Sequence, residues 1–347
     1  MAIHQHGSGN TVSDRFRSLV VRESGEGFVR AIEERSTGDL PGGDVLVRVR
    51  YSSLNYKDAL SATGNRGVTR RYPHTPGIDA AGEVVESSAP EFQPGDVVTV
   101  TDYDLGMNTP GGWGEMIRVP ADWVVPLPEG LTPETSMAVG TAGLTAALSV
   151  LEVTNAGITL DQGDVLVTGA TGGVGSFAVA ILAQAGFGVI AATGKPNANS
   201  FLMDLGATEV IGREDVDGDP ARPMLRGRWA AVVDTVGGPI LAAALKSVQP
   251  SGVVTCCGLV ADPELHTTVY PFILRGIRLI GVDCAECPIA IRHDLWTMLA
   301  GGWRVDGLAG MYRTVALEDV DAEVGRMLEG KSRGRVVVKH RECPVLQ

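Results

Sequence analysis

Two hydrophobic patterns divide the chain. Between residue 17 and about residue 137, short β-branched runs such as 45–51, 83–86 and 96–100 alternate with Gly and Pro turns. This pattern is typical of a strand-rich unit. From Met137 onward, longer apolar runs alternate with short β-branched runs. Such alternation of helices and strands predicts a parallel, doubly wound sheet, and therefore an α/β fold class.

The second half can be divided into individual elements. We predict helices over 137–151, 173–185, 198–205 and 240–248, and strands over 165–168, 189–192, 209–211, 230–234, 253–256 and 277–282. The apolar stretch 177–194 is interrupted by Gln184, Gly186 and Gly188, which favours a helix followed by a strand over a membrane-spanning helix. A final strand over 335–339 is expected to return to the first unit.

Charge and composition narrow the possible partners. The chain of 347 residues carries a formal net charge of −12 and has no Lys/Arg-rich run. Nucleic acid and anionic membranes are therefore not expected as general partners. The first residues are polar and lack the apolar segment of a signal peptide, so we expect a disordered leader over 1–16.

The cysteines point to a reducing cytoplasm. The five residues, at positions 256, 257, 284, 287 and 343, are odd in number and have no framework spacing. Cys284 and Cys287 form a CxxC, but a structural zinc site would need a second matched pair. A redox motif would need a thioredoxin-like setting. We therefore interpret them as separate thiols.

A glycine-rich stretch carries the strongest functional signal. Residues 169–176 read GATGGVGS and lie between a predicted strand and a predicted helix, the context that a dinucleotide-binding fingerprint requires. In the pattern Ala170-x-Gly172-x-x-Gly175, Gly172 lets a pyrophosphate approach the backbone and Gly175 lets the helix pack on the sheet. Free N–H groups at the helix start would bind the phosphates.

Two other phosphate-binding loops do not fit this stretch. A Walker loop needs Lys before its Ser, whereas Gly175 precedes Ser176. The TGxxxGxG motif of short-chain dehydrogenases fits the loop itself, but those enzymes pair it with a catalytic Tyr-x-x-x-Lys. No Tyr in this chain has Lys four residues later. The dinucleotide fingerprint is therefore favoured.

The end of the second strand favours NADP(H). An NAD-selective site places an acidic residue about twenty positions after the loop. Here the corresponding segment ends Thr193-Gly194-Lys195, with a hydroxyl and a cation instead of a carboxylate. Arg213, after the next predicted strand, would supply a second cation for a 2′-phosphate.

Several further motifs carry a resemblance to a known family. They are SSLNYKDA at 52–59, PGIDAAG at 76–82, GTAGLTA at 140–146, DTVGG at 234–238, PFILRGI at 271–277 and Gly334-Arg335. Together with the glycine loop, they resemble the zinc-independent medium-chain dehydrogenase/reductases, in the quinone-oxidoreductase branch. More narrowly, they are similar to the YhdH/YhfP-type quinone oxidoreductases, which include acrylyl-CoA reductases. The similarity extends from about residue 17 to residue 339.

The resemblance implies two domains and no catalytic metal. A GroES-like β-rich catalytic domain is expected over 17–137 and 300–347, and a Rossmann NADP-binding domain over 138–299. Zinc-dependent relatives carry an early Cys and a Gly-His-Glu, where this chain has Asn55 and Gly77-Ile78-Asp79. Without those ligands we expect hydride transfer to an electron-poor carbon. Asp79 is interpreted as a buried structural carboxylate.

The resemblance also implies the site residues. Asn55 and Tyr56 are the catalytic candidates, as oxyanion stabiliser, nicotinamide-positioning group or donor to ribose or substrate. Cofactor contacts are expected at Tyr56, Thr171, Gly172, Gly173, Val174, Thr193, Gly194, Lys195, Arg213, Leu259, Ile273 and Cys284. The family more often has Ser in place of Cys284 and often Arg in place of Lys195. The Lys loses bidentate geometry toward a phosphate, which weakens the NADPH preference.

The expected function is reduction of the C=C bond of a short enoyl-CoA such as acrylyl-CoA by NADPH. The alternatives are a quinone or enone reductase and a non-catalytic NADPH-binding regulator. Tyr103 and Trp113 flank a glycine-rich segment that is expected to border the substrate. The apolar strand 277–282 predicts an edge of the Rossmann sheet through which two copies form a homodimer.

Overall fold

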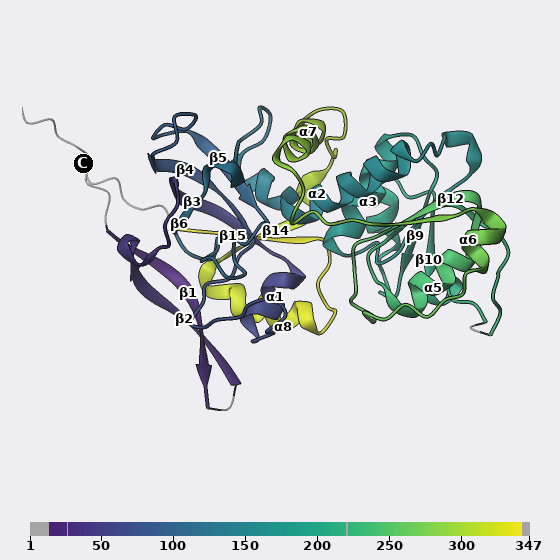
Figure 1. The fold of residues 1–347 in the computed structure, drawn as a ribbon, viewed down its shortest axis with the longest axis horizontal. Helices are drawn as coiled ribbons and strands as arrows, with labels where there is room; N and C mark the ends of the chain where they lie inside the picture. The colour runs from purple at the N-terminus through teal and green to yellow at the C-terminus, as the bar shows by residue number, and fades with distance from the viewer. Residues whose placement is uncertain (1–13, 26, 220, 342–347) are drawn as a thin grey trace, which may run out of the picture.

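The protein folds into two lobes joined by one long helix (Figure 1). A computed structural model describes residues 14–25, 27–219 and 221–341. One lobe is built from the N-terminal strands and the C-terminal segment, and the other from the middle of the chain. The predicted leader lies largely outside the described residues. However, β1 begins at Arg15, and Phe16 is buried against Leu46 and Met116, so these two positions belong to a strand.

The first lobe is a strand-rich unit, as the short β-branched runs predict. β1 and β2 form an antiparallel hairpin, and a seven-stranded sheet has the order β14-β15-β3-β4-β5-β7, with β6 paired to β3. An α-helix between these strands is α1, Tyr56–Ala62. The strands are Arg15–Ser24 (β1), Gly27–Ser36 (β2), Val45–Leu54 (β3), Asp79–Ser87 (β4), Val97–Thr101 (β5), Met116–Val119 (β6), Val124–Pro126 (β7), Tyr312–Ala316 (β14) and Arg335–Lys339 (β15).

The second lobe contains the predicted parallel sheet. Its six strands have the order β10-β9-β8-β11-β12-β13, so the chain reverses direction across the sheet between β8 and β11, where ligands of doubly wound folds bind. The strands are Val165–Val167 (β8), Val189–Thr193 (β9), Glu209–Gly212 (β10), Trp229–Asp234 (β11), Val248–Cys256 (β12) and Arg278–Gly281 (β13). β13 forms one edge of the sheet, as predicted for 277–282.

Helices cover both faces of this sheet. Val165 and Val167 of β8 pack with residues of α2, α3 and α7 on one face, while Leu166 packs with α5 on the other. This alternation follows from the two-residue period of a strand. The helices are Pro133–Asn155 (α2), Gly173–Gln184 (α3), Asn199–Asp204 (α4), Gly238–Ser247 (α5), Tyr270–Arg275 (α6), Ile289–Ala300 (α7) and Val320–Leu328 (α8).

Helix α2 connects the lobes and is kinked at Gly140, which has φ 50° and ψ −160°. This conformation is accessible almost only to glycine. Among the described residues, α2 is the one helix long and apolar enough to cross a membrane, but 72% of its most apolar window is buried inside the protein. Its composition therefore reflects its place in the core. The sequence pattern predicted this helix but not its kink.

The C-terminal strand returns to the first lobe, as predicted. β15 pairs antiparallel with β3 and parallel with β14, so the seven-stranded sheet includes residues from both ends of the chain. Helix α8 packs near α1 beneath it (Figure 1). The boundaries predicted for the two domains remain a prediction, because α2 runs through the position where they meet.

Gly140→Ala is expected to destabilise the protein by more than about 2 kcal/mol, through the cost of an unfavourable backbone conformation together with a steric clash. A Cβ at this position would lie 2.4 Å from Asp79 Oδ2 and 2.8 Å from Arg335 Nη2. Urea unfolding followed by circular dichroism measures the change. The matched control is Gly302→Ala, which meets nothing within 4 Å. Equal stability of the two variants would contradict the expectation.

Candidate functional site at the junction of the lobes

The glycine-rich loop has the geometry of a phosphate-binding turn. It joins β8 to α3, and Gly172 is the N-cap of that helix. A Cβ on Gly175 would lie 2.3 Å from the carbonyl oxygen of Gly169, so glycine is required for the helix to pack this close to the loop. A Cβ on Gly172 would meet only that same oxygen, at 3.3 Å. The first N–H groups of α3, including those of Gly173 and Val174, are therefore available to an anion.

The end of β9 gathers positive charge beside this loop. The hydroxyl of Thr193 lies 3.2 Å from that of Thr171 and accepts from the Lys195 backbone N–H at 3.1 Å. The side chain of Arg213 packs against Gly194. Burial lowers the pKa of Lys195, and the nearby positive charge of Arg333 lowers it further. The predicted residues of this segment thus lie together.

These cations have no acidic partners in the described chain. The Lys195 ammonium donates to the carbonyl oxygen of Ser332, and the Arg333 guanidinium lies over the Phe201 ring. None of Lys195, Arg213 and Arg333 forms an ion pair with a carboxylate among the described residues. Arg333 was not among the predicted contacts, because its approach depends on how the C-terminal segment folds back. The resulting cluster suits a phosphate group.

A buried network around Asp79 forms the other half of the site. Its Oδ2 accepts from Ser53 Oγ at 2.5 Å and from Asn55 Nδ2 at 2.9 Å, and its Oδ1 accepts from Thr141 Oγ1 at 2.6 Å. The backbone N–H of Thr141 also donates to this carboxylate. Asp79 is fully buried, which agrees with its interpretation as a hydrogen-bonded structural carboxylate.

The amide of Asn55 is already engaged in this network. Its Nδ2 lies 2.9 Å from Asp79 and 3.2 Å from Asp58, and its Oδ1 accepts from Arg335 Nη1 at 2.8 Å. Its hydrogen bonds are therefore used within the protein, which favours a positioning role over direct stabilisation of an oxyanion. By contrast, the Tyr56 hydroxyl has no hydrogen-bond partner among the described residues. This half-buried side chain begins α1.

Burial shifts the pKa values of two ionisable groups in the network, Asp58 and Arg335. Burial, with a smaller contribution from the neighbouring Asp79 charge, raises the pKa of Asp58 to about 7. Backbone N–H groups of Ile78 and Asn55 oppose this rise by donating to Asp58. Burial lowers the pKa of Arg335, against the attraction of Asp79 and Asp58. The Asp79–Arg335 contact, at 3.4 Å, is thus a desolvated ion pair.

Arg335 connects the network to the phosphate loop. A Cβ on Gly173 would lie 3.1 Å from Arg335 Cδ, so a glycine at this position lets Arg335 approach the loop closely. The backbone N–H of Gly334 donates to the carbonyl oxygen of Thr171 at 3.0 Å. The candidate site therefore extends without a break from the glycine loop to Asn55. The Gly334-Arg335 motif contributes to the family resemblance, but only the structure shows that these residues contact the glycine loop.

The donor set does not suit zinc. The network contains an amide, hydroxyls, the carboxylates of Asp79 and Asp58 and the Arg335 guanidinium. The guanidinium has no lone pair to donate. Zinc sites use Cys, His and carboxylate ligands. No group of three or more such residues is placed to hold a metal in the part of the chain that the structure describes.

The remaining predicted residues are more dispersed. Cys284 is buried, and this burial raises the pKa of its thiol well above the ordinary value. Leu259 and Ile273 are 56% and 68% exposed, and the latter lies on α6, so their cofactor contacts remain predictions. Trp113 is fully buried and donates to the Ser53 carbonyl; it supports the site from within the core.

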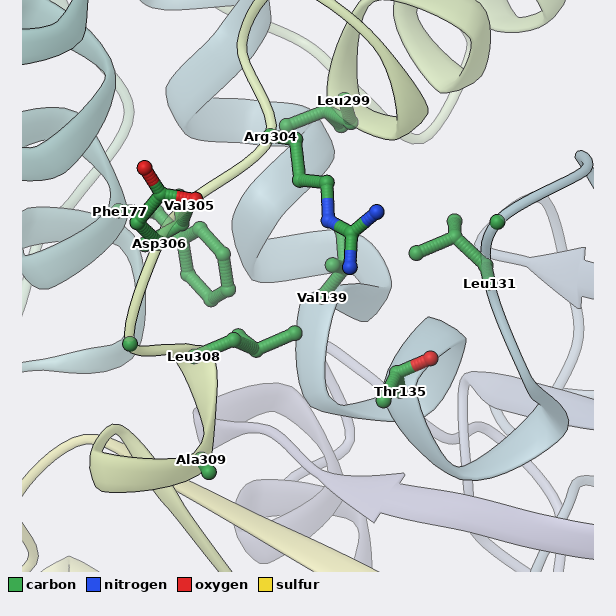
Figure 2. Close-up of a pocket in the computed structure, with 12 residues that line it drawn as sticks. Leu131, Thr135, Val139, Phe177, Leu299, Arg304, Val305, Asp306, Leu308 and Ala309 are labelled. Atoms are coloured by element: carbon green, nitrogen blue, oxygen red, sulfur yellow. The ribbon is translucent and has the colours of Figure 1, made fainter.

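A cavity of about 260 Å³ lies beside the kinked helix and contains none of the predicted site residues. Figure 2 shows Val139 and Thr135 of α2, Phe177 of α3 and Leu308 around it, with the Arg304 guanidinium pointing between them. A second, wider cavity borders β14 and β15. The candidate site is therefore defined by its loop and its polar network, and not by these cavities.

The two lobes define the class of protein. A model of the alcohol dehydrogenase GroES-like domain matches residues 41–129, and a model described as zinc-binding dehydrogenase matches residues 173–300. A GroES-like unit joined to a Rossmann sheet is the architecture of the medium-chain dehydrogenase/reductases.

Three relatives narrow this class. YhfP of Bacillus subtilis is 42% identical over 94% of this chain and 100% of its own. The acrylyl-CoA reductase AcuI of Ruegeria pomeroyi is 44% identical over 93% of this chain and 98% of its own. The crystal structure of the YhdH oxidoreductase from Salmonella enterica in complex with NADP has a TM-score of 0.91 and 39% identity, covering 94% of this chain and 100% of that one. The chain belongs to the YhdH/YhfP/AcuI family of quinone oxidoreductases and acrylyl-CoA reductases.

Proposed function

We propose that this protein is an NADPH-dependent oxidoreductase that reduces the C=C bond of a short α,β-unsaturated acyl-CoA. The observation that carries the proposal is the direct connection between the phosphate loop and the Asn55 network through Gly334 and Arg335. This connection supports a polar reaction site, for which no metal ion is expected, beside the nicotinamide end of a bound dinucleotide. The names of AcuI and of the NADP-bound YhdH structure support the substrate and the cofactor.

Different residues of the chain are proposed to bind the cofactor and to assist the reaction. NADPH, when bound, supplies a hydride. The N–H groups of α3 would hold its pyrophosphate, and Lys195, Arg213 and Arg333 would hold its 2′-phosphate. Hydride addition to the β-carbon leaves negative charge on the thioester oxygen, and the unpaired Tyr56 hydroxyl is the available donor to this oxygen. Asn55 positions the reacting groups through Arg335 and Asp79.

A quinone is the alternative substrate, because it too accepts a hydride without a metal ion. A quinone lacks the phosphates of CoA, so a preference for acyl-CoA would need positive charge along the substrate entrance. A non-catalytic NADPH-binding role is the second alternative, in which cofactor binds without being oxidised by any substrate. With its free thiols, the chain is proposed to work in the cytoplasm.

Lys195→Ala is expected to weaken NADPH binding roughly 10- to 100-fold, because it removes one charged hydrogen bond to the 2′-phosphate. NADH binding should be unchanged, since NADH lacks that phosphate. Titration of nucleotide fluorescence measures both affinities. Lys195→Arg is the matched control and should retain NADPH binding. Equal weakening toward both cofactors would mean that Lys195 acts on the fold and not on the phosphate.

NADPH consumption compared across acrylyl-CoA, crotonyl-CoA and quinones tests the proposed reaction. We expect the highest kcat/KM with acrylyl-CoA. Tyr56→Phe should lower kcat about 100- to 1,000-fold, through loss of one donor to the developing oxyanion, and Asn55→Ala should lower it as well. Full activity of both variants would remove them from the mechanism. Quinone reduction alone, or NADPH binding with no oxidation, would support one of the alternatives.

We also propose a homodimer formed through the edge strand β13. Beside this edge, large apolar side chains are exposed on α6, with Ile273 at 68% and Leu274 at 65%. An unpaired strand edge next to an apolar surface favours association with a second copy. Each subunit of this dimer would then hold its own acyl-CoA site and its own nucleotide site.

Light scattering should therefore give a mass of about twice the 36.4 kDa of the chain. Leu274→Asp should shift this mass toward that of a monomer, because it places a charge in an apolar contact. Leu328→Asp, at a 40% exposed position on α8, is the matched control and should leave the mass unchanged. A monomeric wild-type protein at micromolar concentration would refute the dimer.

A further inference from the structure

A second buried carboxylate, Asp102, lies near the candidate site and is not used by the proposed function. It follows β5 with φ 61°, and Tyr103 follows with φ 50°, two consecutive non-glycine residues in the left-handed region. This backbone is held by hydrogen bonds from Asp102 N–H to the Ile78 carbonyl at 2.7 Å and from Tyr103 N–H to the Ala285 carbonyl at 3.3 Å. Such strained positions often occur at functional sites.

The Asp102 carboxylate is buried without a hydrogen-bond donor. Its side chain is 1% exposed, and neither oxygen has a hydrogen-bond partner. Thr141 is nearby, but its hydroxyl hydrogen is used at 2.6 Å by Asp79. An ionised carboxylate in this position is stabilised by two cations, with Lys57 Nζ at 3.9 Å and Arg292 Nη1 at 3.8 Å.

The two cations differ in their freedom. The Arg292 side chain is fully buried and donates to Thr101 Oγ1, Cys284 O and Ala285 O, so it is fixed in place. Lys57 has no other partner among the described residues, and its side chain is 34% exposed. Asp102 therefore holds an ammonium group that also reaches solvent, and Lys57 directly follows Tyr56 in the first turn of α1.

The surroundings of this pair connect it to the Asp79 network and to the second lobe. Asp102 interacts electrostatically with Asp79 and Cys284 as well as with its two cations. Asp79 belongs to the network that Arg335 joins to the phosphate loop. Cys284 belongs to the segment that leads into α7 of the second lobe. The charged and titratable groups facing the pair are therefore Arg292, Asp79 and Cys284.

We propose that Lys57 is the proton donor to the α-carbon in the reduction, and that Asp102 is the positioning residue that holds its ammonium group over the substrate. This inference rests on the proposed function. The hydride adds to the β-carbon with its electron pair, and the π electrons of the C=C bond move into the thioester enolate. A proton then passes from Lys57 Nζ to the α-carbon, which forms the new C–H bond. The neutral amine is reprotonated by water at its exposed side.

Lys57→Met should lower kcat for crotonyl-CoA about 100-fold or more, the usual contribution of a general acid. Lys57→Arg keeps the charge beside Asp102 but does not release a proton at neutral pH, so it should be equally impaired. Methylamine should partly restore Lys57→Ala. Restoration of activity by Arg would overturn the proposal, because the role would then be purely electrostatic.

The fate of solvent deuterium separates proton donation from a structural effect. In D₂O the wild type should place deuterium on one face of the α-carbon of butyryl-CoA, whereas Lys57→Met should place it on both faces. Asp102→Asn should lower kcat more than it raises KM, because it disturbs only the orientation of the amine. Unchanged rate and stereochemistry in Lys57→Met would also refute the proposal.

Chemical labelling gives a readout without turnover. An amine-reactive ester should modify Lys57 in the free protein, and NADP⁺ with butyryl-CoA should protect it, while Lys339 is labelled equally in both states. Labelling of Lys57 that the ligands leave unchanged would place it outside the site. If the wild type reduces no enoyl-CoA, the proposed function itself fails; if it does so and Lys57→Met matches it, only this inference fails.

Discussion

The fold depends on the buried ion pair between Asp79 and Arg335. Both side chains are almost completely removed from water, so each charge would be very costly if left alone. The pair persists because hydrogen bonds satisfy the rest of each group. Ser53, Asn55 and Thr141 donate to the carboxylate, and the guanidinium donates to the Ala138 carbonyl at 3.1 Å. One interaction therefore fixes β3, β4, the kink of α2 and β15 relative to one another.

The same constraint builds the site. The kink at Gly140 turns the Thr141 N–H toward Asp79, and this bond anchors the start of the helical segment that enters the second lobe. Arg335 also lies against Gly173 and donates to Asn55 Oδ1, so one side chain contacts both the phosphate loop and Asn55. The donor chemistry of this junction is that of an ion pair. The ion pair that joins the lobes therefore also positions the polar groups of the site.

A few polar side chains around the Asp79–Arg335 pair do not use all of their hydrogen-bonding or charge capacity within the protein. Within the described chain, Tyr56, Lys195, Arg213 and the Asp102–Lys57 pair have unused hydrogen-bonding or charge capacity in the junction. The cations of the second lobe suit the phosphates of a nucleotide, and the groups of the first lobe suit a reacting carbonyl. This separation agrees with the roles that the family's nucleotide-binding and catalytic domains have.

The sequence alone determined the elements and the cofactor loop. The spacing of glycines between an apolar strand and helix predicted the turn at 169–176, because only glycine permits such close backbone packing. The hydrophobic periodicity likewise predicted the parallel sheet and its edge strand. These are local properties, so neighbouring residues are sufficient to encode them.

Only the tertiary structure decided which distant side chains meet. Arg335 reaches Asn55 across 280 positions, Arg333 joins Lys195, and Asp102 faces Lys57. Each of these contacts depends on the C-terminal strand returning to β3 or on a strained turn after β5. The kink of α2 could not be predicted for the same reason. It is associated with the carboxylate of Asp79 on β4, and the pattern of residues within the helix does not indicate this contact.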